Sequence, residues 1–414
     1  MTKVLVIGSG GREHALVWKL AQTQCKAYCA PGNGGISQLA HCIPISADNI
    51  SELLAFVKKE NVDLTIVGPE LPLSLGIVDE FQEAGYKIFG PTKNAAQLET
   101  SKAFARKFCS KYNLPAPNFE IFNDSKRAIS YLETKEFPVV IKVSGLAQGK
   151  GVFIVQSLNE AHSIVKKILE NRIFGEEGNT IVIEDFIEGK EISLLTLCDG
   201  EKIIPCIPAR DHKPLYDGNK GPNTGGMGTY APVPELDEKW TEKIENELLT
   251  PLLEALKKEN IEYHGVLYIG LMIKEDKPYI LEFNCRWGDP EAEVLLPLLK
   301  NDLVEICINV IEGHLSILEW KKLYALTVIM ASGGYPGKYE TGKIIKGNLA
   351  DNDNTLIFHC GTKRIDHSFY TSGGRVLAIT GIGATLAEAR KYAYQRVSEI
   401  NFENMYYRND IGVL

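Results

Sequence analysis

The first hundred residues alternate short apolar runs with amphipathic stretches. The apolar runs have the length of β-strands and lie at residues 3–8, 26–30, 64–67 and 87–89. The stretches between them have helical periodicity and cover residues 13–22, 50–60 and 72–84. This repetition predicts an α/β unit with a doubly wound parallel sheet that carries helices on both faces. Ligands bind such sheets beyond the C-terminal strand ends, where this chain has glycine-rich turns at residues 8–11, 31–35 and 68–70.

The rest of the chain follows an α+β pattern. Residues 94–112 form one helical stretch, and Pro115 and Pro117 mark its end. Two apolar runs, at 137–142 and 151–155, predict a hairpin around a glycine-rich loop. Further helices are predicted at 237–259 and 384–400, and further strands at 180–186, 265–273, 278–284, 325–331 and 375–379. The pattern therefore predicts a central α+β region and a small C-terminal α+β domain.

Composition and charge narrow the classes of function. The 414-residue chain is 44% apolar and 24% charged, as in ordinary globular proteins. Its net charge of −8 argues against nucleic acid as the main partner but leaves room for a local basic cleft. No apolar run reaches the roughly 18 residues of a membrane span, and the N-terminal run is too short for a signal peptide. The nine cysteines form no Cys-x-x-Cys pair, which favours free thiols in a reducing cytoplasm.

The turn after the first strand, Gly-Ser-Gly-Gly at residues 8–11, invites comparison with a dinucleotide-binding fingerprint. That fingerprint needs a further glycine where this chain has Glu13, and an acidic residue after the second strand, which this chain lacks. NAD is therefore disfavoured. Glycines at a helix start still offer free N–H groups to a phosphate, and Arg12 adds a positive charge. A tight turn without a ligand is the alternative.

The central glycine-rich loop, residues 142–151, is not a Walker A loop. Its glycine spacing is one residue short, and Gly151 follows its lysine. A glycine-rich hairpin between two strands can instead fold over a triphosphate as a flap, with Lys142 on the strand before it. A plain surface hairpin is the alternative.

Two later strands carry polar side chains suited to a nucleotide and a metal. Glu184 and Glu191 are placed to accept from an adenine amine and a ribose hydroxyl, although a single acid more often lies on a solvated edge. Glu282 and Asn284 alternate on one face of an otherwise apolar strand. Two such oxygen ligands suit Mg²⁺ together with substrate phosphates, and Arg286 on the same face suits a carboxylate or phosphate. A strand with a water-facing side is the alternative.

Residues 210–228 are the longest unusual stretch. They contain Arg-Asp-His-Lys and Gly-Pro-Asn-Thr-Gly-Gly-Met-Gly, and are too rich in glycine and polar residues for a regular element. We therefore expect a long functional loop. His212 has the chemistry of a base, but a lone histidine is more often structural, and no partner that fixes its tautomer is evident.

Together these motifs resemble the phosphoribosylamine–glycine ligase family of the ATP-grasp superfamily. The resemblance runs from residue 3 to residue 413. It rests on motifs in the same order at residues 6–15, 30–35, 67–70, 89–92, 101–104, 142–152, 221–228, 282–286 and 373–377. So many motifs in order are far more specific than any one of them.

The resemblance implies a fold and a reaction. It implies an N-terminal phosphoribosylamine-binding domain (residues 1–101), an ATP-grasp domain (102–313) with a mobile lid at about 119–190, and a C-terminal domain (324–414). It also implies ATP-dependent ligation of glycine to 5-phosphoribosylamine through glycyl phosphate, in de novo purine biosynthesis. ATP is then a co-substrate and Mg²⁺ or Mn²⁺ the cofactor, without nucleic acid or membrane as partner. We expect a cytoplasmic monomer.

The resemblance also assigns roles to residues. The implied metal ligands are Glu282 and Asn284. The implied catalytic residues are Asp211, Arg286 and Lys142. ATP contacts are implied for Lys102, Lys142, Gly145, Gly149, Lys150, Gly151, Glu184, Asp185, Phe186, Ile187 and Glu191. Substrate contacts are implied for Gly10, Gly11, Arg12, Glu13, Gly32, Asn33, Pro69, Glu70, Asn223, Thr224, Gly225, Gly226 and Arg286.

Three departures from the family pattern affect details of the flap and the substrate edge. The family has Ala-Asp-Gly where this chain has Val-Ser-Gly, with Ser144 in place of Asp. It has Gln at the position of Arg210 and often Phe at the position of Trp287. Two other functions remain open. Another ATP-grasp ligase would differ at the N-terminal phosphate loops and at residues 223–228. A catalytically silent nucleotide-binding subunit is disfavoured, because the metal and lysine positions are intact.

Overall fold

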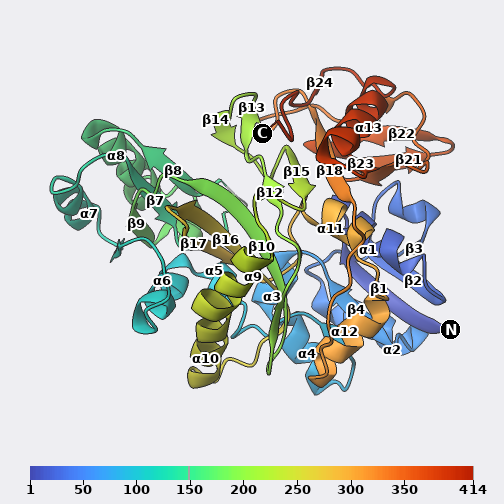
Figure 1. Cartoon of the computed structure of the whole chain (residues 1–414), viewed down its shortest axis with the longest axis horizontal. Helices are drawn as coiled ribbons and strands as arrows, with labels where there is room; N and C mark the ends of the chain where they lie inside the picture. Colours follow the sequence, from blue (N-terminus) through green and yellow to red (C-terminus); the bar gives the residue numbers. More distant parts are fainter. Residues whose placement is uncertain (148–149, 414) are drawn as a thin grey trace.

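The computed structural model describes residues 1–147 and 150–413 (Figure 1). The N-terminal unit is built on a five-stranded sheet of order β3-β2-β1-β4-β5, in which every pair is parallel. Its strands are β1 (Thr2–Gly8), β2 (Cys25–Pro31), β3 (His41–Cys42), β4 (Leu64–Val67) and β5 (Ile88–Phe89). Successive residues of β1 enter two different apolar clusters, one on each face of the sheet. The predicted parallel sheet is therefore confirmed.

Five short helices belong to this unit. They are α1 (Gly11–Leu20), the 3-10 helix η1 (Ile36–Gln38), α2 (Ile50–Glu60), α3 (Glu70–Leu75) and α4 (Ile77–Glu83). The stretch at 72–84, expected as one helix, is divided because Gly76 adopts a left-handed φ of +95° at the end of α3.

The helical stretch expected at 94–112 is also divided. It forms α5 (Gln97–Thr100) and α6 (Lys102–Lys111). Ser101 between them is extended, and its Oγ accepts the N–H of Phe104 at 3.2 Å, which caps α6. Lys102 becomes the first residue of α6, and its backbone N–H donates to the carbonyl of Ser144 at 2.9 Å.

The lid, residues 119–185, forms a separate lobe at the left of Figure 1. Its sheet has the antiparallel order β6-β9-β7-β8. The strands are β6 (Phe119–Phe122), β7 (Val139–Val143), β8 (Val152–Val155) and β9 (Ile181–Asp185). The helices are α7 (Ser125–Leu132), α8 (Leu158–Val165), the π-helical turn η2 (Lys166–Glu170) and η3 (Gly175–Gly178). The apolar cluster of the lid contains residues of the lid alone.

The central sheet has the antiparallel order β11-β10-β16-β17. Its strands are β10 (Lys190–Asp199), β11 (Ile203–Pro205), β16 (His264–Lys274) and β17 (Lys277–Asn284). The helix expected at 237–259 runs through a π-helical turn, as α9 (Glu238–Ile244), η4 (Glu245–Leu249) and α10 (Thr250–Lys258). After β17 come α11 (Ala292–Leu298) and α12 (Leu303–Glu312).

A six-stranded sheet joins the segment before α9 to the C-terminal unit. Its strands are β12 (Arg210–Asp211), β15 (Gly228–Ala231), β18 (Tyr324–Ser332), β20 (Thr355–His359), β23 (Arg375–Gly383) and β24 (Met405–Tyr406). The remaining elements are β13 (Pro214–Tyr216), β14 (Lys220–Asn223), β19 (Ile344–Ile345), β21 (Thr362–Ile365), β22 (Ser368–Thr371) and α13 (Leu386–Ser398).

The expectation of a long loop at 210–228 is therefore wrong. This segment contains three short strands and the first residue of β15: β13 pairs with β14, and β12 pairs with β15, which joins the C-terminal sheet through β18. Strand pairing outweighs the low strand propensity of its glycines.

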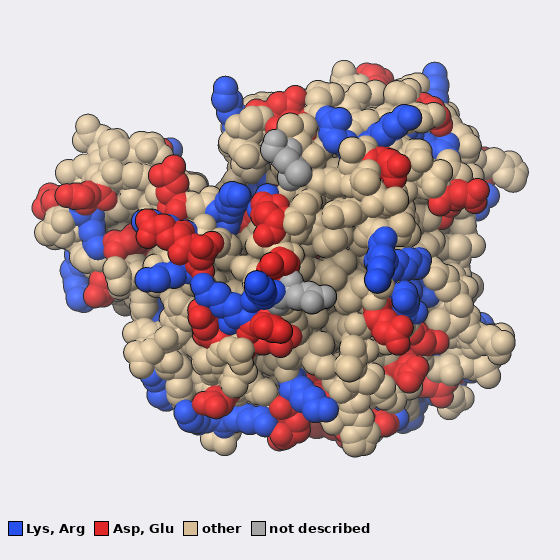
Figure 2. All heavy atoms as spheres, viewed as in Figure 1, with Lys and Arg blue, Asp and Glu red and all other residues tan. Residues whose placement is uncertain are grey.

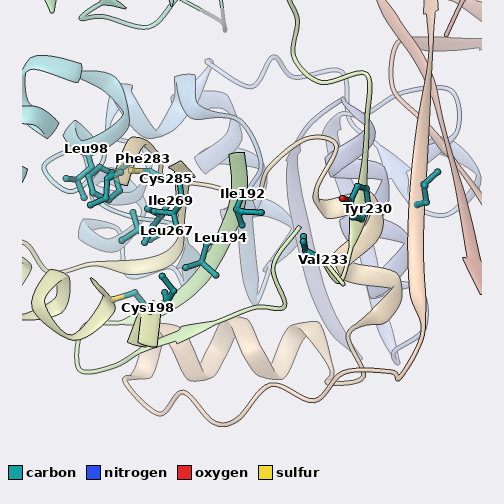
Figure 3. Packing of buried hydrophobic residues seen from close by; sticks show 14 of the residues in the cluster. Leu98, Ile192, Leu194, Cys198, Tyr230, Val233, Leu267, Ile269, Phe283 and Cys285 are labelled. Carbon is teal, nitrogen blue, oxygen red and sulfur yellow. The ribbon is translucent and has the colours of Figure 1, made fainter. Parts of the chain in front are cut away.

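Apolar clusters show which units share a core. One cluster combines residues of β10, β16 and β17 with residues of β18 and β23, and Figure 3 shows part of it. A second combines residues of α1 and β1 with residues of β10, α11 and β18. The N-terminal, central and C-terminal units thus pack through common cores. Within the described residues, no helix combines the length and apolarity needed to cross a membrane.

Candidate active site

The predicted ATP-grasp residues lie where the lid meets the central sheet. β7 carries Lys142 and β9 carries Glu184, whereas β17 carries Glu282. Lys142 Nζ lies 2.8 Å from Glu184 Oε2 and donates to the carbonyl of Leu281 at 2.8 Å. This lysine therefore joins the lid to the edge of β17.

Arg106 on α6 completes this group and was not predicted from the sequence. Its Nε lies 2.6 Å from Glu184 Oε1 and its Nη2 lies 3.1 Å from Oε2. Burial opposes ionisation of Glu184, but Lys142 and Arg106 lower the pKa of its carboxyl below the usual value. Burial lowers the pKa of Lys142 to about 8, against the effect of Glu184. Both oxygens of Glu184 are already paired with Arg106 or Lys142, and the adenine contact stays a prediction.

The next predicted adenine residues end the lid. Asp185 lies 2.8 Å from Lys135 Nζ in the lid and accepts from Asn118 Nδ2, just before β6, at 2.9 Å. Phe186 is exposed and Ile187 is half-buried. The Asp185 carboxylate is thus used to fix the end of β9, and the ATP contacts of these residues stay predictions.

Glu282 and Asn284 lie on one face of β17, and each is half-buried. Lys213 Nζ lies 3.0 Å from Glu282 Oε1 and 2.6 Å from Glu191 Oε1. The Lys213 ammonium holds the pKa of the Glu282 carboxyl well below its usual range, so the carboxylate is ionised. An ionised carboxylate and an amide oxygen are hard donors that fit Mg²⁺. In residues 1–147 and 150–413, no three His, Cys, Asp or Glu side chains gather in an arrangement that could hold a metal ion.

Arg286 lies where β17 meets two helices. Its Nη2 lies 2.9 Å from Glu99 Oε1 on α5 and donates to Asn284 Oδ1 at 3.2 Å. Its Nε lies 3.4 Å from Glu70 Oε2, which follows Pro69 at the start of α3. Burial opposes the charge of Arg286, but Glu99 and Glu70 raise the pKa of its guanidinium above the usual range. Arg286, which was predicted to bind a carboxylate or phosphate of the substrate, therefore pairs with carboxylates of its own chain.

The predicted catalytic Asp211 lies on β12, beside Lys213. Its Oδ1 accepts the N–H of His212 at 2.7 Å. Burial and the nearby Glu291 raise the pKa of the Asp211 carboxyl well above its usual value, against the effect of Lys213. Burial lowers the pKa of His212 to about 4, and its Nδ1 lies 3.3 Å from the carbonyl of Gly228. His212 is therefore a buried neutral residue of the strand pair.

The glycine turn before α1 is shaped by the acid that follows it. The Gly10 N–H donates to Glu13 Oε2 at 2.5 Å, and Arg12 Nε lies 2.6 Å from Glu13 Oε1. Arg12 also donates to the carbonyl of Trp287 at 3.2 Å. A Cβ on Gly68 would lie 2.0 Å from Glu13 Oε1, so only glycine leaves room for this carboxylate. The substrate contacts expected at this turn stay predictions.

Two other predicted substrate residues lie where the N-terminal unit meets the C-terminal unit. Asn33 Nδ2 donates to the carbonyls of Ser9 at 2.9 Å and His359 at 2.7 Å, and its Oδ1 accepts two N–H groups of its own loop. Gly32 precedes it in the same loop, and Gly11 lies against the side chain of Glu293. The Asn33 amide therefore holds two units together, and its contact with a substrate stays a prediction.

The loop after β14 is anchored on several sides. Thr224 Oγ1 donates to the carbonyl of Lys213 at 2.7 Å. The Gly225 N–H donates to the hydroxyl of Tyr335 at 3.0 Å, and the Gly225 carbonyl accepts from Arg375 Nη1 at 2.6 Å. The predicted substrate residues of this segment are Asn223, Thr224, Gly225 and Gly226.

The predicted flap rests against η3. The Gly145 N–H donates to the carbonyl of Glu177 at 3.2 Å, and the Leu146 N–H donates to Glu177 Oε2 at 2.9 Å. At the other end of the flap, the Gly151 carbonyl accepts the N–H of the last residue of β7. The predicted ATP residue Gly149 lies outside the described residues.

A cavity of about 1100 Å³ opens between the lid and the C-terminal unit. Its walls include Lys150 and residues 152–154 of the lid, the β13–β14 hairpin, and residues 332–337. On this face, acidic and basic side chains gather beside a hollow that separates the lid lobe from the body (Figure 2). The cavity therefore borders the flap and the β13–β14 hairpin rather than Lys142, Glu184 and Glu282.

Sequence reasoning missed Arg106, Lys213 and Glu99. Lys213 lies two residues after the predicted Asp211, so the sequence indicates its segment but not its pairing with Glu191 and Glu282. Nothing local marks the other two, which lie on α6 and α5 as ordinary charged helix residues.

Three family models together match nearly the whole chain. The N domain of phosphoribosylglycinamide synthetase matches residues 2–99, its ATP-grasp (A) domain matches residues 100–292, and its C domain matches residues 325–414. Among curated proteins, the phosphoribosylamine–glycine ligase of Caldanaerobacter subterraneus is 48% identical over 414 residues, which is 99% of each chain. That of Halalkalibacterium halodurans is 44% identical and covers 99% of this chain and 96% of its own.

Solved structures agree. A phosphoribosylamine–glycine ligase from Thermotoga maritima superposes with a TM-score of 0.87 at 35% identity, over 99% of this chain and all of the other. The biotin carboxylase domain of a Hydrogenobacter thermophilus 2-oxoglutarate carboxylase has a TM-score of 0.78 at 15% identity, over 98% and 91% of the two chains, which shows a common fold alone. With the domains in the same order and the identity sustained over the full length, this chain is an ATP-grasp enzyme of the phosphoribosylamine–glycine ligase family.

Proposed function

We propose that this enzyme ligates glycine to 5-phosphoribosylamine at the expense of ATP, in de novo purine biosynthesis. The products are glycinamide ribonucleotide, ADP and phosphate. The single observation that carries the proposal is the convergence of Lys142, Lys213, Glu282 and Asn284 at the lid, in a chain whose relatives are named for this ligation over their whole length.

ATP binds between the lid and the central sheet. Lys142 exchanges its contact with Glu184 for the triphosphate, and Arg106 keeps the freed carboxylate neutralised. Lys102 at the start of α6 and Lys150 on the lid add positive charge. The adenine follows the end of β9, at residues 184–187, and the ribose reaches Glu191.

Glu282 and Asn284 hold a divalent ion, Mg²⁺ or Mn²⁺. When bound, this ion neutralises charge on the triphosphate during transfer. Lys213 lies 3.0 Å from Glu282 and keeps it ionised, and Arg286 fixes the amide of Asn284.

The reaction needs positioning and charge neutralisation rather than a protein nucleophile. The carboxylate of glycine attacks the γ-phosphate and yields glycyl phosphate and ADP. The amine of phosphoribosylamine then attacks the acyl carbon and expels phosphate. Asp211, whose pKa burial and Glu291 raise, takes the proton that this amine loses. Arg286 and Lys142 balance the charge of the two phosphates.

The phosphoribosylamine lies across the N-terminal turns. Its 5-phosphate meets the glycine turn at Gly10 and the start of α1, where the helix dipole favours an anion. Glu70 and the loop after β14 face the ribose and the amine. We further propose that the enzyme acts as a monomer in the cytoplasm.

The test is a coupled assay of ADP release with glycine, ATP and freshly prepared phosphoribosylamine. We expect release only when all three are present, together with formation of glycinamide ribonucleotide by mass spectrometry. Omission of glycine and replacement of phosphoribosylamine by ribose 5-phosphate are the controls. ADP release that does not depend on glycine would contradict the proposal and favour another ATP-grasp ligase.

A further inference from the structure

The side chain of Arg375, at the start of β23, extends from the C-terminal unit toward the loop after β14. Its Nη1 donates to the carbonyl of Gly225 at 2.6 Å and to the carbonyl of Asp289 at 3.0 Å. The same nitrogen lies 3.0 Å from Asp289 Oδ1. The side chains of Arg375 and Asp289 are 18% and 13% exposed, so the pair is largely shielded from water.

Asp289 lies beside the turn that the proposed function assigns to the 5-phosphate. A Cβ placed on Gly10 would lie 3.3 Å from Asp289 Oδ2 and 3.0 Å from Glu13 Oε2. The carboxylates of Glu13 and Asp289 thus border Gly10. Each one has an arginine partner, since Arg12 lies 2.6 Å from Glu13 and Arg375 lies 3.0 Å from Asp289.

Without Arg375, the Asp289 carboxylate would strongly repel a phosphate bound at this turn, because the pair is largely shielded from bulk water. Burial opposes the charge of Arg375, but Asp289 raises the pKa of its guanidinium above the usual range, so the cation persists. Arg375 also fixes the Gly225 peptide, whose N–H is held by Tyr335 on the other side.

We propose that Arg375 is a positioning residue that neutralises Asp289, so that the turn at Gly10 accepts the phosphate of the ribose substrate. This inference rests on the proposed function. It gives the C-terminal unit a part in substrate binding that needs no contact between Arg375 and the substrate.

The rival role, a direct bond from Arg375 to the phosphate, is separated by a double variant. We would measure the affinity for ribose 5-phosphate by calorimetry with the full-length enzyme and its Arg375→Ala, Arg375→Lys and Arg375→Ala/Asp289→Asn variants. Ribose 5-phosphate carries the phosphate and is stable. Lys391→Ala changes an exposed cation of α13 in the same unit and is the matched control.

We expect Arg375→Ala to lower the affinity for ribose 5-phosphate by roughly tenfold or more, because Asp289 loses its partner. Arg375→Lys should restore part of the affinity. Arg375→Ala/Asp289→Asn should bind within about threefold of the parent, because no net charge is left beside the turn.

If Asp289→Asn fails to restore affinity, Arg375 contacts the phosphate directly and the positioning role is overturned. Equal affinity of parent and Arg375→Ala would also overturn it. The proposed function fails separately, when the parent enzyme releases no ADP with glycine, ATP and phosphoribosylamine.

Discussion

Charged side chains of the site balance one another before any substrate is present. Lys142 and Arg106 share Glu184, and Lys213 is shared between Glu191 and Glu282. The spacing along β17 allowed its polar face to be predicted, because alternate residues of a strand share a side. The partners Arg106 on α6 and Lys213 after β12 could not be predicted, since only the fold brings them to β17. Such groups are costly to disturb singly, because removal of one partner leaves a shielded charge.

The first prediction concerns the metal ligand. Glu282→Gln keeps the size of the side chain and removes its charge, so we expect kcat to fall by roughly 100-fold or more. The protein should still fold, because Lys213 keeps Glu191 as a partner. The measurement is steady-state turnover at saturating Mg²⁺, with circular dichroism to establish folding. Glu188→Gln, an exposed position between lid and central sheet, is the control. Near-normal turnover of folded Glu282→Gln would rule out the assignment.

A second prediction concerns Glu293 on α11. This residue is fully buried, and its carboxyl oxygens have no hydrogen-bond partner among the described residues. Burial, and then Asp289, raise the pKa of its carboxyl well above 4.5. The folded protein therefore keeps a proton that the unfolded chain releases above that pH. The contribution of this carboxyl to stability is complete below pH 4.5 and is lost as the pH rises, by up to about 1.4 kcal/mol per unit.

Glu293→Gln supplies a neutral side chain of the same shape at every pH. We expect it to melt at a higher temperature than the parent near neutral pH, with the two converging toward about pH 4.5. Calorimetry across this interval is the measurement, and Glu262→Gln, an exposed acid before β16, is the control. A variant that melts at or below the parent temperature throughout would mean that Glu293 is ionised in the fold.

At the scale of elements, most strands and helices lie close to where periodicity predicts them. The exceptions have local or distant causes. Gly76 and Ser101 divide helices whose apolar periodicity continues across the break, because a left-handed residue and a capping side chain decide helix ends. Within 210–228, β13 and β14 form a local hairpin, whereas β12 is held through β15, whose partner β18 lies a hundred residues further on.

The cap at Ser101 gives a third prediction. Ser101→Ala should lower the free energy of unfolding by about 1 kcal/mol, because the Phe104 N–H loses its acceptor. It should also raise the KM for ATP, because α6 carries Lys102 and Arg106 into the site. Thr385→Ala removes the equivalent cap of α13 and should cost similar stability without changing the KM. If the two variants have the same KM for ATP, the cap of α6 has no part in nucleotide binding.

The fourth prediction concerns the flap. Its described amides are held by few contacts, chiefly those of Gly145 and Leu146 with Glu177, an exposed residue. Such contacts open easily, so we expect amide exchange at residues 145–147 to be fast without nucleotide. An ATP analogue should slow it as the flap closes over the phosphates. Hydrogen exchange with and without the analogue is the measurement, with β10 amides as the internal reference. Equal protection in both states would mean a static hairpin.

Across the described residues, the lid enters no apolar cluster shared with another unit, whereas the N-terminal unit has one cluster of its own and shares a second. The other units share cores, so they hold the N-terminal turns, β17 and the C-terminal sheet in fixed relation. The fold class was predicted correctly because alternation of elements and an ordered series of motifs both survive in the sequence. The shared cores could not be predicted, because an apolar residue does not indicate which distant face it will meet.

The hydrogen bond from Asn33 to the carbonyl of His359 spans 326 residues. During synthesis, the loop that carries Asn33 leaves the ribosome long before its acceptor exists. The N-terminal strands are therefore translated before the later units that complete one of their two apolar clusters. A nascent chain stalled before β20 would already contain the lid and the central sheet but lack the acceptor that holds the Asn33 loop, so its substrate loop would be unfinished.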